Sequence, residues 1–384
     1  MTAAPLETSS RRGRPATEYG VEVMFTSQDD FVRNCWYVAG WSSEFAGPGP
    51  FGREFLGEAI VFYRGSNGQL RAFEDRCAHR HAPLSLGRVE GDQLRCLYHG
   101  MLFGTDGKCV EVPGQDIVPP AACVSTYPLV EHGGWAWIWM GEPAAADPAM
   151  IPQSIGFDED RWTLLTGHLD YDAPANLIND NLLDLSHLSY VHANSFGATS
   201  GWTNKQPATT KIDRGVRVDR WVLDTPPIPP LPSLRGYSSV DMWATYEFIV
   251  PGVFLMYTAL HPPGTAERLE HGEPKIEDAL FDNFTLQAVT PITTEQSRYF
   301  FSWGPGTRFG GADIAQQMLD VACMAFQEDK IMIEAQYRIM KKAPERRIVP
   351  IAADRTPILF QRMMDKMRRH SGPENDALSG ATST

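Results

Sequence analysis

Several features that define common protein classes are missing from this sequence of 384 residues. No stretch holds the roughly eighteen consecutive apolar residues that a membrane-spanning helix needs. Residues 1–20 contain paired arginines but no apolar core, so we expect no signal peptide. Basic charge is scarce, because 34 Lys and Arg face 47 Asp and Glu, for a formal net charge of −13. That balance argues against nucleic acids and anionic membrane surfaces as partners.

Cysteine is also sparse, with six residues in the chain, which does not suggest a disulfide framework in a protein of this length. Two of the six belong to the motif described next. The other four lie in apolar surroundings, and we expect them to be buried free thiols: Cys35, Cys109, Cys123 and Cys323. Free thiols fit a reducing cytoplasm.

The stretch 76–115 carries the most specific motif. Cys77-x-His79 is followed, after residues 80–95, by Cys96-x-x-His99. Each half pairs one thiol with one imidazole, whereas zinc fingers usually pair cysteine with cysteine and histidine with histidine. Two thiolates and two imidazoles in this mixed order are the ligands of a Rieske [2Fe–2S] cluster, in which one iron takes both cysteines and the other both histidines. A zinc site is the alternative that the ligand types leave open.

Tight loops are expected around these ligands, so that each loop supplies one residue to each iron. Turn-forming residues follow the ligands: Pro83, Gly87, Gly100, Gly104, Gly107 and Pro113. His81 lies two residues beyond His79, and we interpret it as a loop residue outside the ligand set.

A second candidate metal site lies in a segment that we expect to be helical from Ala173 to His192. It carries His187 and His192, which an ideal helix would place about 140° apart. The two histidines can share a metal only if the helix ends or bulges between them, as helices do at some functional sites. With one carboxylate they would form the two-His-one-carboxylate triad of non-heme Fe(II) oxygenases. Taken alone, they are more often ordinary helix residues.

Together the two motifs resemble those of the Rieske non-heme iron oxygenases, over nearly the whole chain between its two ends. Small departures are Ala78, where Pro is usual, and Met101, where Trp is usual. The resemblance implies that His187, His192 and a distant Asp329 bind Fe(II), with Glu328 as the second choice for the carboxylate.

The family pattern Asn-x-x-Asp-x-x-His-x4-His also gives roles to Asp184 and Asn181. Asp184 lies three residues before His187, so we expect its carboxylate to reach the free ring nitrogen of that histidine. The resemblance implies that Asp184 links this site to the Rieske cluster of a neighbouring subunit. Asn181 is given a secondary role at the same site.

The implied fold is α+β, with an antiparallel β Rieske domain followed by a helix-grip catalytic domain. We place flexible tails at 1–25 and 372–384, the Rieske domain at 26–150 and the catalytic domain at 151–371. Expected elements of the second domain are strands at 162–171, 242–250, 252–260, 279–289 and 298–303, and helices at 313–342 and 356–370. Gly304 to Gly310 lies between a strand and a helix as a dinucleotide loop would, but its glycine spacing is wrong, so we interpret it as a plain connection.

The implied activity is O2-dependent oxidation of a small aromatic compound, with electrons from an NAD(P)H-dependent reductase, a ferredoxin or both. The length and the spacing of the cluster motif resemble the vanillate and dicamba O-demethylases, which form rings of three identical subunits. Oxidative O- or N-dealkylation is therefore expected. Alternatives are an arene cis-dihydroxylating α subunit and, outside this class, an electron-transfer Rieske protein or a ligand-binding helix-grip protein. The expected pocket is aromatic: Trp243, Tyr246, Phe248, Phe254, Tyr257 and Phe284.

Overall fold

In the part of the chain that the structure describes, the strands of the computed structural model pair with antiparallel neighbours in four sheets. The structure describes residues 31–370 apart from 48, 154, 155, 158, 194, 196–199, 204, 205 and 228–231. The predicted tails at 1–25 and 372–384 lie outside the described residues.

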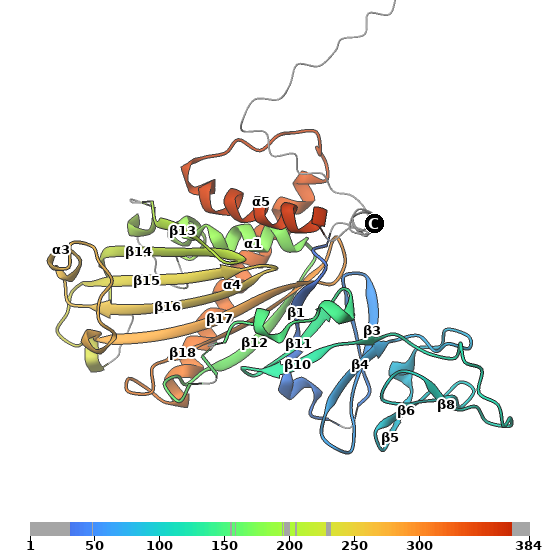
Figure 1. Cartoon of the computed structure of the whole chain (residues 1–384). Helices are drawn as coiled ribbons and strands as arrows, with labels where there is room; N and C mark the ends of the chain where they lie inside the picture. The colour runs from blue at the N-terminus through green and yellow to red at the C-terminus, as the bar shows by residue number, and fades with distance from the viewer. Residues whose placement is uncertain are drawn as a thin grey trace, which may run out of the picture.

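Two small sheets form the end of the molecule that carries the cysteine–histidine motif (Figure 1). The first has the order β2-β3-β4-β9, with bounds β2 Phe51–Phe55, β3 Glu58–Arg64, β4 Leu70–Glu74 and β9 Thr126–Tyr127. The second has the order β5-β6-β7-β8, with bounds β5 Arg88–Glu90, β6 Gln93–Arg95, β7 Leu102–Phe103 and β8 Cys109–Glu111. A turn at Gly65–Gly68 joins β3 to β4 in a hairpin.

A three-stranded sheet connects this end to the rest of the molecule. Its order is β1-β11-β10, with bounds β1 Cys35–Trp41, β10 Leu129–His132 and β11 Trp135–Met140. The alternating tryptophans of β11, Trp135, Trp137 and Trp139, are buried in the core. They pack in one cluster with Leu286 and Phe300 of the large sheet, and the hydroxyl of Thr290 donates to the carbonyl of Val38 at 2.7 Å. The two halves of the chain therefore share a core.

The large sheet has seven strands in the order β12-β18-β17-β16-β15-β14-β13. Their bounds are β12 Leu165–Tyr171, β13 Ala208–Ile212, β14 Gly215–Thr225, β15 Val240–Ile249, β16 Val253–His261, β17 Phe281–Pro291 and β18 Ser297–Pro305. Strands β13 and β14 were not predicted from the sequence, although Val216 and Val218 alternate as a half-buried strand requires. Residues 306–311 join β18 to the next helix, as the interpretation of the Gly304–Gly310 stretch predicted.

Helices cover one face of this sheet (Figure 1), with bounds α1 Ala175–Leu183, α2 Leu188–Val191, α4 Ala312–Met340 and α5 Arg355–His370. The short α3 Thr265–Arg268 lies at the start of β15, where the N–H of Ala266 donates to Asp241. The small residues Ala315, Ala322 and Ala325 of α4 are fully buried, so this helix can approach the sheet closely. Met324 and Ile331, apolar positions of the same helix, are exposed. None of the helices in the described part of the chain is both long and apolar enough to span a membrane.

Two predictions about local structure were wrong. The single helix expected at 173–192 is three pieces, α1, a 3-10 turn at Leu185–His187, and α2. Cys123 and Cys323 are exposed rather than buried, whereas Cys35 and Cys109 are buried as expected. Apolar neighbours in sequence did not bury Cys323 because it lies on the outer face of α4, away from the sheet.

Candidate metal centres

The loops that carry the cluster motif have the same backbone structure. In each loop the N–H of the cysteine donates to the carbonyl five residues later, at 2.9 Å for both Cys77 and Cys96. The residue four positions after each cysteine donates back to it and has a left-handed conformation, with φ 58° at His81 and 78° at Gly100. His81 thus takes the turn position that glycine takes in the second loop. This backbone role accounts for its place outside the candidate ligand set.

The two loops bring like ligands together. The rings of His79 and His99 have centroids 4.6 Å apart and are exposed, whereas Cys77 and Cys96 are each 2 % exposed. Burial, with the Cys96 thiol close by, raises the pKa of Cys77 to about 11. Such a thiol loses its proton at neutral pH only when a cation replaces it. A thiol pair beside an imidazole pair fits a two-iron cluster with two ligands on each iron.

The second candidate site is formed where α1 ends. The chain leaves the helix at Asp184 (φ −110°, ψ 89°) and continues into the 3-10 turn that ends at His187. His192 is the C-terminal cap of α2. Because the helix is broken between them, the two histidines are not held at the angle of about 140° around the helix axis that one continuous helix would impose.

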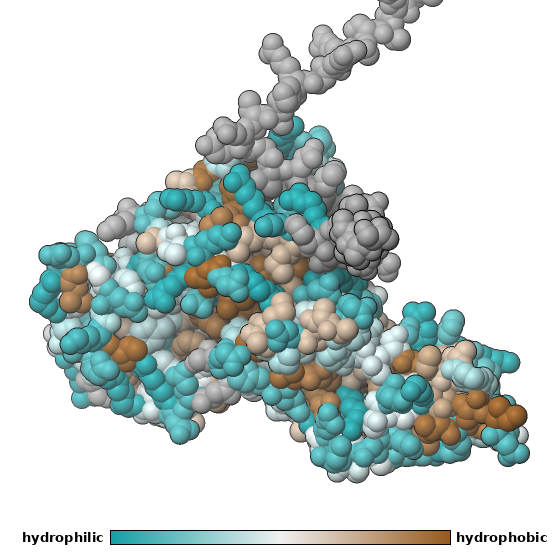
Figure 2. Space-filling model, viewed as in Figure 1, coloured by the Kyte–Doolittle hydropathy of each residue, from teal (hydrophilic) through white to brown (hydrophobic). Residues whose placement is uncertain are grey.

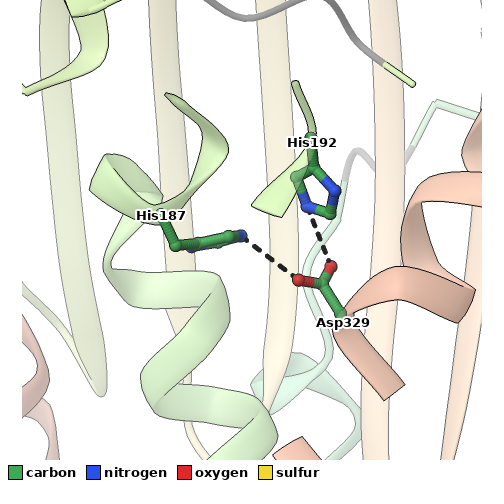
Figure 3. A group of neighbouring side chains, drawn as sticks. All are labelled: His187, His192 and Asp329. Atoms are coloured by element: carbon green, nitrogen blue, oxygen red, sulfur yellow. Dashed lines mark ion pairs between the residues drawn. The ribbon is translucent and has the colours of Figure 1, made fainter. Parts of the chain in front are cut away.

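Asp329 of α4 meets both histidines (Figure 3). Its Oδ1 lies 3.4 Å from Nε2 of His187, and its Oδ2 lies 3.2 Å from Nε2 of His192. One ligand atom from each of the three residues lies within 4.8 Å of the others. The structure therefore brings together the three residues that the family resemblance singled out, from segments more than a hundred residues apart.

Burial and charge at this group favour a cation. Asp329 is 4 % exposed and His192 1 % exposed, and a buried carboxylate is costly unless a positive charge or donors balance it. Burial lowers the pKa of His187 below its usual value despite the charge of Asp329. Burial also lowers the pKa of His192, but the hydrogen bonds and charges of Asp329 and Glu328 outweigh it and raise the pKa. Two imidazoles and one carboxylate on one side of an ion are the donor set of non-heme Fe(II) sites.

Neighbouring groups fix the outer nitrogens of the two histidines. The Nδ1–H of His187 donates to the carbonyl of Asp184 at 2.6 Å, so its Nε2 carries the lone pair that faces Asp329. Nδ1 of His192 lies 2.9 Å from Oε2 of Glu328, which also accepts from the hydroxyl of Ser195 at 2.7 Å. Such contacts orient metal-binding imidazoles. Glu328 therefore lies behind His192 rather than among the three converging groups.

The expected contact of the Asp184 carboxylate was wrong in detail. Its Oδ1 accepts from the N–H of Ser186 at 2.9 Å and caps the 3-10 turn, and its main-chain carbonyl, not its carboxylate, meets His187. The prediction assumed helical geometry between positions 184 and 187, and the helix has already ended there. Asn181 does lie at the site, since its Nδ2 donates to Oδ1 of Asp329 at 3.2 Å.

A buried positive charge beside Asp184 was not predicted from the sequence. Arg220 of β14 is 8 % exposed, its guanidinium lies 5.0 Å from the ring of Trp202, and it donates to that residue's carbonyl at 2.8 Å. A cavity of about 10 Å³, just large enough for one water, is lined by Asp184, Arg220 and Tyr246 among others. No local pattern marks a lone arginine on a strand, so only the fold could reveal it.

The six aromatic residues expected to line one pocket do not share one face of the sheet. Strand pairing places Tyr246 and Phe254 on the face that α1 and α4 cover. Trp243 and Tyr257 lie on the opposite face in a cluster with Trp221, and Phe284 packs there against Trp162. Both faces of this sheet are apolar, so alternation alone could not decide which face the helices cover.

Comparison with known proteins finds matches to both halves of the chain. Residues 35–128 match the family model of the Rieske [2Fe-2S] domain, and residues 171–370 match that of the vanillate O-demethylase oxygenase C-terminal domain. The iron-sulfur subunit of the toluene-4-sulfonate monooxygenase system of Comamonas testosteroni is 38 % identical over 328 residues, which cover 84 % of this chain and 93 % of the relative. The vanillate O-demethylase oxygenase subunit of a Pseudomonas species is 32 % identical over 344 residues, which cover 88 % of this chain and 95 % of the relative. The crystal structure of dicamba monooxygenase bound to dicamba superposes with a TM-score of 0.76 at 29 % identity, covering 88 % of this chain and 98 % of that chain.

The chain therefore belongs to the Rieske non-heme iron oxygenases, as an oxygenase component of the vanillate O-demethylase type. It is an oxidoreductase whose cofactors are a Rieske [2Fe–2S] cluster and a mononuclear non-heme iron. The predicted fold class, an N-terminal β Rieske domain followed by an α+β catalytic domain, is confirmed.

Proposed function

We propose that this protein carries out oxidative O- or N-dealkylation of a small aromatic compound. The observation that carries this proposal is the convergence of His187, His192 and Asp329 in a chain that also carries a complete Rieske motif. An electron carrier needs no second open metal site. Relatives named vanillate O-demethylase and dicamba O-demethylase support dealkylation over ring cis-dihydroxylation.

We assign Cys77, His79, Cys96 and His99 to the cluster and the triad to Fe(II). When bound, the two metal groups supply electron storage and the activation of O2 beside a substrate. The chain's own residues orient this chemistry. Glu328 and the carbonyl of Asp184 fix the two imidazoles, and the amide of Asn181 holds the carboxylate of Asp329.

Asp184 takes a further role in this proposal, as the route by which an electron reaches the mononuclear site. Its carbonyl touches His187 and its carboxylate lies at the break between helices. We propose that a ring of three subunits brings His99 of a neighbouring copy to this carboxylate. The exposed ring of His99 and the exposed apolar residues Leu97 and Tyr98 beside it suit such a contact. Figure 2 shows apolar surface at this end of the molecule.

The remaining assignments belong to the same proposal. We divide the chain into a Rieske domain at 26–150 and a catalytic domain at 151–371, although their cores are continuous through β1 and β11. A reductase, directly or through a ferredoxin, delivers the electrons, and the protein works in the cytoplasm.

The test is a turnover screen of methoxy- and N-alkyl-aromatic compounds with NADH, a surrogate reductase and O2, with aldehyde release measured. Formaldehyde formed in step with a dealkylated aromatic product supports the proposal. A cis-dihydrodiol as the main product, or a requirement for a second kind of subunit, contradicts it. A chain that contains about two irons instead of about three would point to an electron carrier.

A further inference from the structure

Gln287 of β17 lies on the face of the large sheet that α1 and α4 cover. It pairs with Phe301 of β18, so the two side chains share a face of the sheet. The ring of Phe301 has its centroid 4.8 Å from that of Phe326, which lies one turn before Asp329 on α4. One neighbour of Gln287 therefore touches the helical turn that supplies the carboxylate of the triad.

The other neighbour is linked to the end of α1 through Tyr246. Gln287 also pairs with Phe254 of β16, whose ring has its centroid 5.0 Å from that of Tyr246. The hydroxyl of Tyr246 donates at 3.0 Å to the carbonyl of Leu183, the residue before Asp184. The strand neighbours of Gln287 thus lead on one side to the turn that carries Asp329 and on the other, through Tyr246, to the helix break that precedes His187.

Hydrogen bonding fixes which end of the Gln287 amide is free. The hydroxyl of Thr285 donates to the carbonyl of Ser302 at 2.6 Å, and a hydroxyl has only one proton to give. The oxygen of Thr285 can therefore only accept from Gln287, so the group that faces it at 3.0 Å must be the amide Nε2. The amide oxygen, Oε1, is the end that remains.

That oxygen is buried and has no hydrogen-bond partner among the residues that the structure describes. Gln287 is 5 % exposed, and a buried acceptor without a donor is costly. We propose that the donor comes from the substrate. Resting on the dealkylation proposed above, this makes Gln287 a specificity-determining residue that favours aromatic substrates with an O–H or N–H group, such as phenols and anilides.

The test compares pairs of probes that differ in this donor. We would measure binding of 2-, 3- and 4-methoxyphenol and of the three fluoroanisoles, which replace O–H by F, by equilibrium dialysis on the resting holoenzyme. For at least one isomer, the phenol should bind about 10-fold or more tightly than its fluoro partner. For pairs that release aldehyde, kcat/KM for the phenol should exceed that for its fluoro partner by the same factor.

Variants separate this role from a structural one. Gln287→Leu should bring the phenol-to-fluoro ratio close to one, whereas Gln296→Leu, at an exposed glutamine bonded to Asp172, should leave it unchanged. Thr285→Val removes the hydroxyl that holds the amide of Gln287, so the amide can rotate. The phenol-to-fluoro ratio should therefore fall but stay above one. General damage to the fold would weaken both members of each pair equally.

The proposal is overturned if the wild-type ratio is close to one for all three isomers, or if Gln287→Leu keeps the preference. Because binding is measured without turnover, this result stands even if no aldehyde is ever formed. Absence of aldehyde from every alkyl-aromatic compound would contradict the dealkylation instead.

Discussion

Asp329 and Glu328 are adjacent on α4, and their different roles, as metal ligand and as partner of the His192 imidazole, can be tested by matched amide substitutions. Both carboxylates lie beside His192, but Asp329 faces the space between the histidines while Glu328 lies behind the ring. A carboxylate about 4 Å from a unit positive charge contributes about 4 kcal/mol at an effective dielectric of about 20, and more for a divalent ion. Asp329→Asn should therefore weaken Fe(II) binding by at least about 1000-fold.

Glu328→Gln should cost much less. Its side chain is 26 % exposed and acts on the ion only through the imidazole of His192. Loss of such an outer contact lowers metal affinity by about 10- to 100-fold. The assay is iron per chain after desalting, followed by Fe(II) titration. The absorbance of the cluster serves as an internal control, because both substitutions are remote from it.

After desalting, Asp329→Asn should keep about two irons per chain, all in the cluster, and Glu328→Gln should regain the third iron at higher Fe(II) concentration. The opposite order of affinities would show that Glu328 is the ligand. Loss of cluster absorbance in Asp329→Asn would show that the substitution disturbs the fold and not only one site.

Three further predictions concern other parts of the chain. Asp184→Asn should keep the cluster and most of the mononuclear iron but abolish steady-state turnover; a wild-type rate of cluster reoxidation in a single turnover, with product formed, would remove Asp184 from the electron route. His99→Cys should lower the reduction potential of the cluster, because a thiolate replaces a neutral ligand; redox titration followed by EPR measures the shift, and an unchanged potential would contradict the assignment of His99. Burial raises the pKa of Asp180, which accepts from Gln361 of α5, to about 7. The folded state therefore binds more protons than the unfolded state between about pH 4 and 7, so stability should fall as pH rises through that window. Asp180→Asn should flatten this dependence in denaturant unfolding curves, and an unchanged slope would refute it.

Local motifs could be predicted from the sequence, whereas long-range geometry could not. The cluster residues and the pair His187 and His192 lie within short segments whose spacing indicates their chemistry. Asp329 could be proposed only through family resemblance, because no local pattern on a long amphipathic helix separates one acid from the next. The carbonyl contact of Asp184 depends on where α1 ends, which sequence places only to within a few residues.

The inner face of the large sheet was the least predictable part. Trp243 and Tyr246 are both buried aromatic residues three positions apart on one strand, and they face opposite sides. Gln287 gave no signal in the sequence at all. Its free oxygen follows from a chain of hydrogen bonds through Thr285 and Ser302 that only the strand register reveals.

The burial of the cluster thiols has a consequence for the order of events in a catalytic cycle. Leu94, Phe103 and their neighbours pack around Cys77 and Cys96, which are each 2 % exposed, whereas the imidazole edge formed by His79 and His99 is exposed. An electron that enters and an electron that leaves by the shortest path must both cross this one edge. If a neighbouring subunit covers the edge, the protein that delivers electrons has to approach over the adjoining surface and transfer them through intervening side chains. The cluster would then be reduced through its contact with the donor protein and oxidised through its contact with the neighbouring subunit. Both contacts could exist at the same time, so reduction of the cluster would not require the two copies to separate.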